Sequence, residues 1–338
     1  MRTLIVGVGA LGGLVAARLR GTGSPVWLAT RSAASAAALR ASGLRVAGVG
    51  GALSVEVTEV APLDGYGPPD AFDLIVLATK AQDAMALAPR LPGLLAPGGV
   101  LLPLQNGGVA QAIAERTPEG CVLGGLSNLG ASVTAPGVVE QRNAGHLLVG
   151  ELAGGESERT ERVRRWLERA VEVRVTPNLR GAVWSKLLLN CSVTTLGAVA
   201  GRTMREYLAL PGGRELFERT YREAYRVALL SGARPERMLV DPTPPTRSGT
   251  GAEARAYEAW LGEIVKGYGD VKPSMLQDFE RGRATEIDFI NGYVAKVGRQ
   301  LGLGVPANTA IVETVHGITR RELAPGPALL ERILEACP

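Results

Sequence analysis

Cysteine and histidine are scarce in this sequence, and their scarcity excludes several classes of protein. The three cysteines, Cys121, Cys191 and Cys337, are odd in number and far apart in a chain of 338 residues. They fit neither a disulfide framework nor a metal cluster, and they favour a reducing compartment, the cytoplasm. The two histidines lie outside every motif described below, so we expect no metal site.

Long hydrophobic runs and an excess of charge of one sign are lacking too. No apolar stretch reaches the roughly 18 residues of a membrane span without an interrupting glycine or charge. The 37 basic and 33 acidic residues are interspersed and leave a net charge of +4, so neither nucleic acid nor a membrane is an expected partner. Residues 1–17 are apolar enough for a signal peptide, but their glycines have another explanation, given below.

Lysine is rare as well, because only five of the 37 basic residues are lysines and the other 32 are arginines. Where this chain needs only a solvated positive charge it uses arginine. A lysine among apolar residues is therefore expected to serve as a compact, titratable amine. Lys80 and Lys186 both stand in such surroundings.

Short apolar strands and helical segments alternate through the first half of the chain. Strands are expected over residues 2–8, 26–30, 74–79, 100–104 and 121–126, with a glycine-broken pair over 44–60, and helices over 11–20 and 32–41 and around residues 85 and 113. This alternation predicts an α/β domain with a largely parallel sheet and helices on both faces.

The pattern changes after residue 149. A charged helix over 156–170 and a last strand over 171–175 are followed almost entirely by helical periodicity, with an irregular segment over 267–283. A chain of this length exceeds one ordinary hydrophobic core. We therefore expect two domains, a dinucleotide-binding domain over residues 1–176 and a helical substrate domain over residues 177–338.

A glycine motif follows the first strand and opens the first helix. It reads Gly7-Val8-Gly9-Ala10-Leu11-Gly12. In such a motif the first glycine permits a tight turn, the second lets a pyrophosphate approach the backbone at the helix N-terminus, and the third lets helix and strand pack closely. The alternative is a glycine-rich turn without function, but the strand-to-helix context favours a dinucleotide site.

Arg31 indicates which dinucleotide is bound. An NAD site normally has a carboxylate at the end of the second strand, whereas residues 29–32 read Ala-Thr-Arg-Ser. Arg31 can pair with a 2′-phosphate, so NADP(H) is the expected cofactor. The alternative is that Arg31 is one surface arginine among many.

Lys80 and Asn106 follow two later strands of the predicted sheet. In open α/β sheets, ligands bind at the carboxyl ends of the strands, so both side chains are expected to reach that crevice. Asn106 with Gly107 would also suit an ordinary turn.

Lys186 stands in a strongly apolar helical segment. Residues four apart share a helix face, so Lys186, Asn190 and Thr194 are expected to form one polar stripe that finds its partners in a ligand. An internal ion pair of Lys186 is the alternative. Glu286 is expected at the start of a helix, where the helix dipole alone would favour a carboxylate.

Taken together, these residues resemble the ketopantoate reductase family over nearly the whole chain. The resemblance is carried by the glycine motif, Lys80, Asn106-Gly107, Trp184-Ser185-Lys186 with Asn190-Cys191, and most specifically by residues 274–278 (Ser-Met-Leu-Gln-Asp) and 285–288 (Thr-Glu-Ile-Asp) with Asn291-Gly292. It implies a Rossmann-type N-terminal domain, a helical C-terminal domain like that of 6-phosphogluconate dehydrogenase, and an active site in the cleft between them. The implied reaction is NADPH-dependent reduction of 2-dehydropantoate to (R)-pantoate in pantothenate synthesis.

The resemblance also implies residue roles. Lys186 would be the general acid, Asn190 and Ser274 would hold the substrate, and Asn106 and Glu286 would help to position cofactor and substrate. Ala131 would lie near the cofactor.

This chain departs from the family pattern at two positions. The family usually has asparagines where Thr194 and Met204 stand, and both changes affect the expected substrate pocket. A reductase of another branched or hydroxylated 2-oxo acid is therefore an alternative. A non-catalytic NADPH-binding sensor is a second alternative, and a homodimer is compatible with the sequence.

Overall fold

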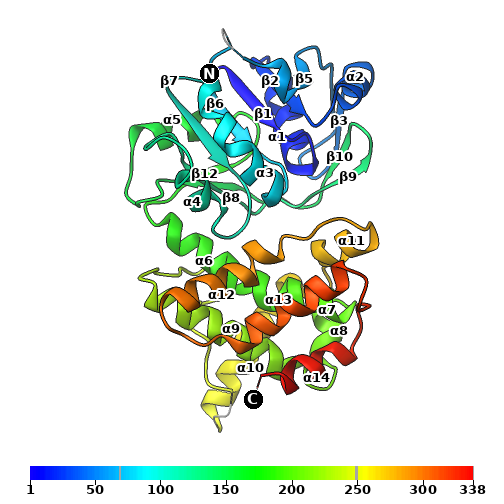
Figure 1. The fold of residues 1–338 in the computed structure, drawn as a ribbon, viewed down its shortest axis with the longest axis vertical. Helices are drawn as coiled ribbons and strands as arrows, with labels where there is room; N and C mark the ends of the chain where they lie inside the picture. The colour runs from blue at the N-terminus through cyan, green and yellow to red at the C-terminus, as the bar shows by residue number, and fades with distance from the viewer. Residues whose placement is uncertain (68–69, 248–249, 338) are drawn as a thin grey trace. The chain divides into compact units, whose positions relative to one another are not determined.

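The computed structural model describes residues 1–67, 70–247 and 250–337 of the chain (Figure 1). The chain divides into two compact units, Met1–Leu179 and Arg180–Pro338, and each has its own hydrophobic core. This division falls three residues after the expected boundary between residues 176 and 177. The first unit contains β-sheets and helices, the second contains helices, and the predicted fold class is thereby confirmed.

The first unit alternates strands and helices along its sequence. Its strands are β1 (Thr3–Val6), β2 (Val26–Thr30), β3 (Leu44–Gly48), β4 (Leu53–Val55), β5 (Val60–Pro62), β6 (Phe72–Leu77), β7 (Leu95–Pro103), β8 (Gly124–Ser127), β9 (Ala131–Ala135), β10 (Val138–Gln141), β11 (Leu147–Gly150) and β12 (Val173–Val175). Its helices are α1 (Ala10–Gly21), α2 (Ala33–Ser42), α3 (Ala81–Leu87), α4 (Val109–Ala114) and α5 (Glu158–Leu167), with 3₁₀ turns η1 (Leu63–Gly65), η2 (Ala88–Arg90) and η3 (Pro92–Leu94).

Five strands form a wholly parallel sheet in the order β5-β2-β1-β6-β7. The chain leaves β1 for β2 on one side and later reaches β6 on the other, so the topological switch point lies between β1 and β6. β1 is buried at every position, as the β-prone and mostly apolar sequence Thr-Leu-Ile-Val of a central parallel strand predicts. Ligands of open α/β sheets bind outside the carboxyl ends of the strands at such a switch point.

Helix α1 is packed between two sheets. It contacts β1 and β2 of the parallel sheet and β3, β4, β9 and β10 of a four-stranded sheet with the order β4-β3-β10-β9. The residues from Gly12 to Ala17 are all buried, because a helix covered on two sides must be apolar all round. At Gly13 an added Cβ would already approach Val139 Cγ2 to 3.1 Å.

The four-stranded sheet was not predicted from the sequence. The expected pair of strands over 44–60 is three strands, of which β3 and β4 form a hairpin and β5 joins the parallel sheet. Strands β9, β10 and β11 were not expected, and β11 joins β8 and β12 in a third sheet. β9 and β10 form a hairpin with each other, but β10 also pairs with β3, and β11 pairs with β8 and β12, over longer separations that local periodicity does not reveal.

The second unit is built from helices. They are α6 (Leu179–Leu189), a π-helical turn η4 (Asn190–Thr194), α7 (Thr195–Ala200), α8 (Met204–Leu208), α9 (Gly213–Leu230), α10 (Ala252–Tyr268), α11 (Ser274–Glu280), a 3₁₀ turn η5 (Ile287–Phe289), α12 (Asn291–Gln300), α13 (Pro306–Thr319) and α14 (Ala328–Glu335).

The continuous helical segment 179–200 lies in the core of this unit. By length and composition it could cross a membrane, but 78% of its most apolar window is buried against the rest of the protein. Leu188, Leu196 and Val199 are fully buried in the hydrophobic core. The segment is therefore a core helix of this unit.

Two local expectations for this unit are wrong. The segment 267–283, expected to be irregular, contains the end of α10 and all of α11. Glu286 does not open a long helix, because it precedes the 3₁₀ turn η5 and α12 begins only at Asn291. Backbone φ and ψ of −106° and −98° at Ile290 separate the turn from α12.

Candidate functional site

The register of the parallel sheet brings four of the predicted residues to one edge. Val6 is paired with Ala29 and Leu77, and Leu77 is paired with Pro103, so the carboxyl ends of β1, β2, β6 and β7 are level. Gly7, Arg31, Lys80 and Asn106 follow these ends within three residues. These residues therefore lie at the edge where ligands of doubly wound sheets bind.

The glycines of the motif each have a distinct steric reason. Gly7 has a φ of +97°, and a Cβ there would lie 2.8 Å from the backbone nitrogen of Thr79. A Cβ on Gly12 would lie 2.0 Å from the carbonyl oxygen of Gly7, so only glycine permits this helix to approach the strand. A Cβ on Gly9 would meet nothing within 4 Å. Gly9 therefore faces open space, where a pyrophosphate could approach the backbone.

The N-terminus of α1 is suited to an anion. Gly9 is its N-cap, and among the described residues no side chain caps the helix. The first N–H groups of a helix have no intrahelical acceptor and carry the positive end of its dipole. With Val8, Ala10 and Leu11 partly buried around it, this end of α1 fits the diphosphate of a dinucleotide.

Two polar side chains at the same edge, those of Gln105 and Thr79, were not predicted from the sequence. Gln105 is 7% exposed, and its Nε2 donates to the carbonyl oxygens of Leu77 and Thr79, both at 2.9 Å. Gln105 Oε1 and Thr79 Oγ1 are buried and have no partner among the described residues. Buried polar atoms are normally paired, so a ligand at this edge would satisfy them. The signal available in the sequence was that Thr79 directly precedes Lys80 and Gln105 directly precedes Asn106.

Arg31 lies where a 2′-phosphate would be recognised, but it already has an anionic partner. Its Nη2 donates to Asp83 Oδ2 at 2.9 Å. Asp83 is in the first turn of α3, and Lys80 is the N-cap of that helix. The Arg31 side chain is 86% exposed, so it remains accessible to a ligand while paired.

Asn106 and Ala131 lie on different elements of the first unit. Asn106 is partly buried in the turn between β7 and α4, and its side-chain amide has no hydrogen-bond partner among the described residues. The next residue, Gly107, has a φ of +67°, so the backbone forms an ordinary turn here. Ala131 begins β9, which packs against α1, and it is also partly buried.

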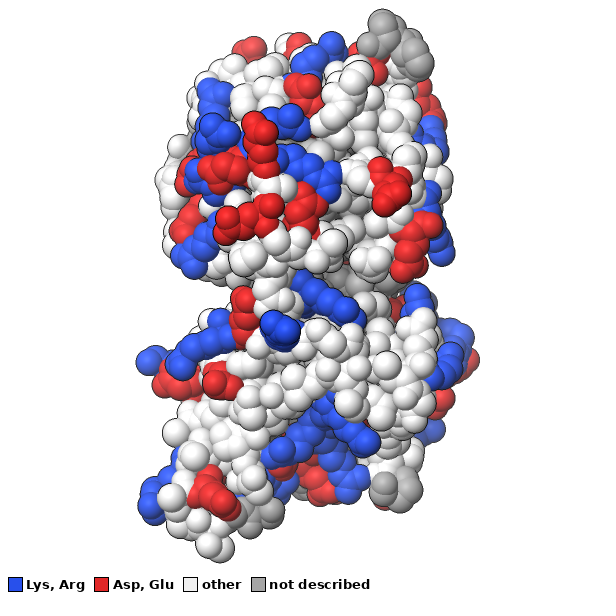
Figure 2. Space-filling model, turned by 90° about the vertical axis from the view of Figure 1, so that its left-hand side faces the viewer, with Lys and Arg blue, Asp and Glu red and all other residues white. Residues whose placement is uncertain are grey.

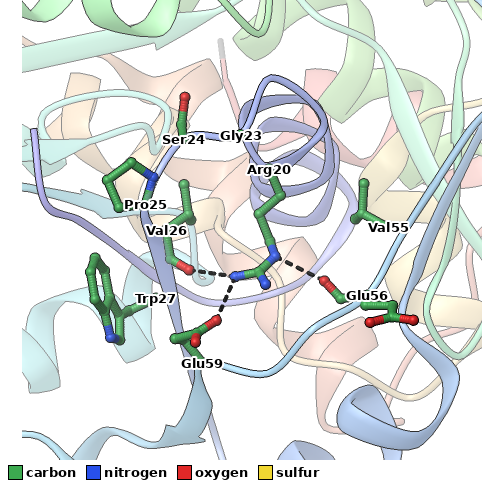
Figure 3. Close-up of a pocket in the computed structure, with 9 residues that line it drawn as sticks. All are labelled: Arg20, Gly23, Ser24, Pro25, Val26, Trp27, Val55, Glu56 and Glu59. Carbon is green, nitrogen blue, oxygen red and sulfur yellow. Dashed lines mark hydrogen bonds and ion pairs between the residues drawn. The ribbon is translucent and has the colours of Figure 1, made fainter.

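A pocket of about 470 Å³ lies elsewhere in this unit, where β2 begins and α1 ends (Figure 3). Arg20 closes one side, donating to the carbonyl oxygens of Val26 and Glu56 and to the carboxylate of Glu59 (Figure 3). The amino end of a parallel strand is the wrong edge for a dinucleotide.

Basic and acidic side chains are interspersed over the visible face of this unit, without a surface of one sign (Figure 2).

In the helical unit, Lys186 is partly buried on α6. Its burial removes water from the ammonium and lowers the pKa of Lys186 from its usual 10.5 to about 8. The carboxylate of Glu286 acts in the opposite direction and raises that pKa, but burial outweighs it. An amine with such a pKa is protonated at neutral pH and still able to release its proton, as a general acid requires.

Glu286 is held by the turn that follows it. Ile287 is 1% exposed and anchors the turn in the core. Asp288 Oδ1 lies 2.9 Å from Nε2 of His316 on α13. His316, to which the sequence gave no role, thus fixes the segment that carries Glu286, and this long-range contact left no local signal.

The expected stripe of Lys186, Asn190 and Thr194 is modified by the π turn η4. Asn190 begins this turn and Thr194 ends it, so i→i+5 hydrogen bonding replaces the α-helical pattern between them. Both side chains are partly buried. The Thr194 hydroxyl donates to the Asn190 carbonyl oxygen at 3.0 Å, whereas the amide of Asn190 has no partner among the described residues.

Ser274 and Met204 have contrasting environments. Ser274 is exposed at the first position of α11 and is available to a ligand. Met204 is 1% exposed and packs in the hydrophobic core. Among the described residues, no three His, Cys, Asp or Glu side chains are grouped in a way that could hold a metal ion.

Comparison with known proteins places the whole chain in one family. Residues 3–154 match the sequence model described as ketopantoate reductase PanE/ApbA, and residues 178–319 match that of the C-terminal part of the same family. The 2-dehydropantoate 2-reductase of Halobacterium salinarum is 30% identical over 318 residues, which cover 94% of this chain and 98% of that protein.

Solved structures show the same fold. A PanE/ApbA family ketopantoate reductase from Ralstonia eutropha has a TM-score of 0.79 with 24% identity, covering 95% of this chain and 99% of that one. A D-mandelate dehydrogenase, solved as a ternary structure with NADH and anilino(oxo)acetate, has a TM-score of 0.80 with 21% identity over the same shares. Both sequence models and the Halobacterium salinarum protein show that the chain belongs to the ketopantoate reductase PanE/ApbA family.

Proposed function

We propose that this protein reduces 2-dehydropantoate to (R)-pantoate with NADPH. Family membership supports the coarser statement that it is an oxidoreductase of a small 2-oxo acid that uses a nicotinamide dinucleotide. The observation that carries the catalytic proposal is the desolvated amine of Lys186, whose pKa is lowered to about 8.

The residues of the first unit fit the cofactor. The open backbone at Gly9 and the uncapped start of α1 would hold the diphosphate, and Arg31 would pair with the 2′-phosphate. Lys80, at the end of β6, would contact the cofactor, and Asn106, at the end of β7, would contact the cofactor and the substrate. NADPH bound in this way supplies the hydride that reduces C2 of the 2-oxo acid.

Lys186 would act on the oxygen of the same carbonyl group. Its ammonium donates a hydrogen bond to that oxygen, stabilises the negative charge that develops there, and transfers a proton to give the hydroxyl group. The amine then regains a proton from solvent. Glu286 supports this role because its charge favours the protonated amine. Asn190, whose amide is unpaired among the described residues, and Ser274 would hold the substrate.

Thr194 favours a second candidate substrate class. A threonine whose hydroxyl is engaged by the Asn190 carbonyl offers less hydrogen bonding to a substrate than an asparagine would. The structural neighbour named D-mandelate dehydrogenase has the same fold. Another 2-oxo acid with a bulkier or less polar side chain is therefore the alternative substrate.

A panel of 2-oxo acids assayed with NADPH and with NADH tests the proposal. We expect 2-dehydropantoate with NADPH to have the highest kcat/KM of the panel. A higher kcat/KM for an aryl or branched 2-oxo acid would move the assignment to the second candidate. Binding of NADPH without turnover of any 2-oxo acid would favour a sensor and contradict the proposal.

A further inference from the structure

The π turn η4 interrupts the core helix four residues after Lys186. A π turn contains one residue more than an α-helical turn, so it rotates the side chains before it relative to those after it. Such turns are rare and costly in themselves, and they persist where surrounding structure holds them. The chain therefore needs specific contacts to keep this turn.

Three successive carbonyl groups of the turn accept hydrogen bonds from side chains. The Asn190 carbonyl oxygen accepts from the hydroxyls of Thr194 and Thr195, both at 3.0 Å. The Cys191 oxygen accepts from Asn291 Nδ2 at 3.2 Å, and the Ser192 oxygen accepts from the Tyr207 hydroxyl at 2.8 Å. Tyr207 and Asn291 come from α8 and α12, so the tertiary structure imposes the turn.

Asn291 is itself fixed by a buried polar network. Its Nδ2 also donates to Asn308 Oδ1 at 3.0 Å, and Asn308 Nδ2 donates to Glu223 Oε2 at 2.9 Å. Glu223 accepts the backbone N–H groups of Ala307 and Asn308 at the start of α13, both at 2.9 Å. Asn291 and Asn308 are fully buried, so water does not compete for these bonds.

The network lowers the stability of the core because it leaves a buried polar atom unpaired. This loss indicates a role beyond packing. Asn291 Oδ1 is buried without a partner among the described residues, which an apolar side chain would avoid. The helix is held in the core on both sides of the turn, because Leu188 of α6 and Leu196 and Val199 of α7 are fully buried. A loss of the π turn would therefore change the rotation of α6 relative to α7, and with it the orientation of Lys186 on α6.

We propose that Tyr207 and Asn291 are positioning residues, which hold the π turn and thereby orient Lys186 and Asn190 for the reduction of the 2-oxo acid. This inference rests on the proposed function for its catalytic consequence. Neither residue touches the reacting atoms; each acts through the carbonyl groups of η4.

The chain provides a matched control for Tyr207. Tyr221 is also buried in the helical core, at 1% exposure against 0% for Tyr207, and its hydroxyl donates to the Pro242 carbonyl oxygen at 3.0 Å. Tyr207→Phe and Tyr221→Phe each remove one buried hydroxyl, so each should lower the Tm by about 2–4 °C. Only Tyr207→Phe is expected to lower kcat, by roughly 5-fold or more, with the KM for NADPH unchanged.

A second readout does not depend on the substrate. Five lysines in the chain make the side-chain ¹³C NMR signals of labelled lysine resolvable, and Lys186→Arg assigns the signal of Lys186. In the unmodified protein and in Tyr221→Phe, the pKa of Lys186 should be about 8. In Tyr207→Phe and Asn291→Ser, loosening of α6 should admit water and raise this pKa by at least about half a unit toward its usual value.

The outcomes separate the two proposals. If Tyr207→Phe lowers the Tm as Tyr221→Phe does but leaves both kcat and the Lys186 titration unchanged, the turn is purely structural and the inference is wrong. If no 2-oxo acid is turned over, the proposed function fails. The titration in Tyr207→Phe and Asn291→Ser then still supports or overturns the coupling between the π turn and Lys186.

Discussion

The Glu286 carboxylate raises the pKa of Lys186, yet burial of the amine has the larger effect and leaves that pKa at about 8. The two residues come from different parts of the chain, α6 and the segment before η5, and the turn after Glu286 is anchored by Ile287 and Asp288. A buried carboxylate beside an amine usually keeps the amine charged. Here the balance leaves an acid that can give up its proton near neutral pH.

The first prediction concerns the proton that Lys186 donates. Lys186→Arg keeps a positive charge but a guanidinium does not readily release a proton, so turnover should fall close to that of Lys186→Ala, by the roughly 10²- to 10⁴-fold typical of a missing general acid. Binding of NADPH, measured by fluorescence titration, should be retained. Lys296→Arg, on the exposed side of α12, is the control and should leave kcat unchanged. Near-normal turnover of Lys186→Arg would mean that the proton comes from elsewhere.

The second prediction is the pH dependence of the reduction. Because Lys186 must be protonated, kcat/KM should decline as pH rises through about 8. Glu286 raises the pKa of Lys186, so Glu286→Gln should lower that pKa and move the decline to lower pH. The measurement is a pH profile of kcat/KM for both proteins. A decline that stays at the same pH in Glu286→Gln would contradict the electrostatic coupling.

The third prediction is that Lys186 lowers the stability of the fold. Its pKa in the folded protein is below its usual 10.5. The desolvated ammonium therefore lowers the free energy of unfolding at every pH below about 8. Lys186→Met should raise the free energy of unfolding at pH 7 by about 1–3 kcal/mol, a range set below the full effect of the pKa shift because the residue is only partly buried. The gain should shrink as pH rises from about 8 toward 10.5. Denaturant unfolding at several pH values measures this, and Lys296→Met, which is exposed, should show no such gain.

The fourth prediction separates two glycines of the same motif. Gly12→Ala places a methyl group against the Gly7 carbonyl oxygen, 2.0 Å away, and should destabilise the protein by about 2 kcal/mol or more. Gly9→Ala meets no atom within 4 Å and should leave stability within about 0.5 kcal/mol. Its methyl group occupies the space proposed for the diphosphate, so NADPH affinity should fall at least about 10-fold. Unchanged NADPH affinity in Gly9→Ala would place the dinucleotide elsewhere.

The fifth prediction concerns the choice between NADPH and NADH. Arg31→Ala should weaken NADPH binding by the roughly 1.5–3 kcal/mol of a charge-assisted hydrogen bond and leave NADH binding nearly unchanged. Asp83→Asn removes the carboxylate that competes for Arg31 at 2.9 Å, so it should increase the preference for NADPH. The pair is exposed, and we expect an increase of only a few-fold. Equal kcat/KM with both cofactors in the unmodified protein would remove the basis of both expectations.

Much of the first unit could be predicted from local sequence. Strand β2 was expected at its observed bounds, and the α/β alternation predicted a parallel sheet. The reasons are local: Gly7 has a positive φ, a Cβ at position 12 would meet the Gly7 carbonyl oxygen, and β1 is mostly apolar. Because the carboxyl ends of parallel strands are level, the order of elements alone put Lys80 and Asn106 at the same edge.

Other features were decided only by tertiary structure. The sequence showed apolar residues around Lys186, but the lowering of its pKa depends on how helices pack over α6, and the π turn that follows is held by Tyr207 and Asn291. The pairing of β10 with β3 and the ion pair between Arg31 and Asp83 join segments far apart in the chain. Periodicity and helix or strand propensity report only on neighbours within a few residues, whereas desolvation and hydrogen bonding of a buried group depend on every element that packs against it.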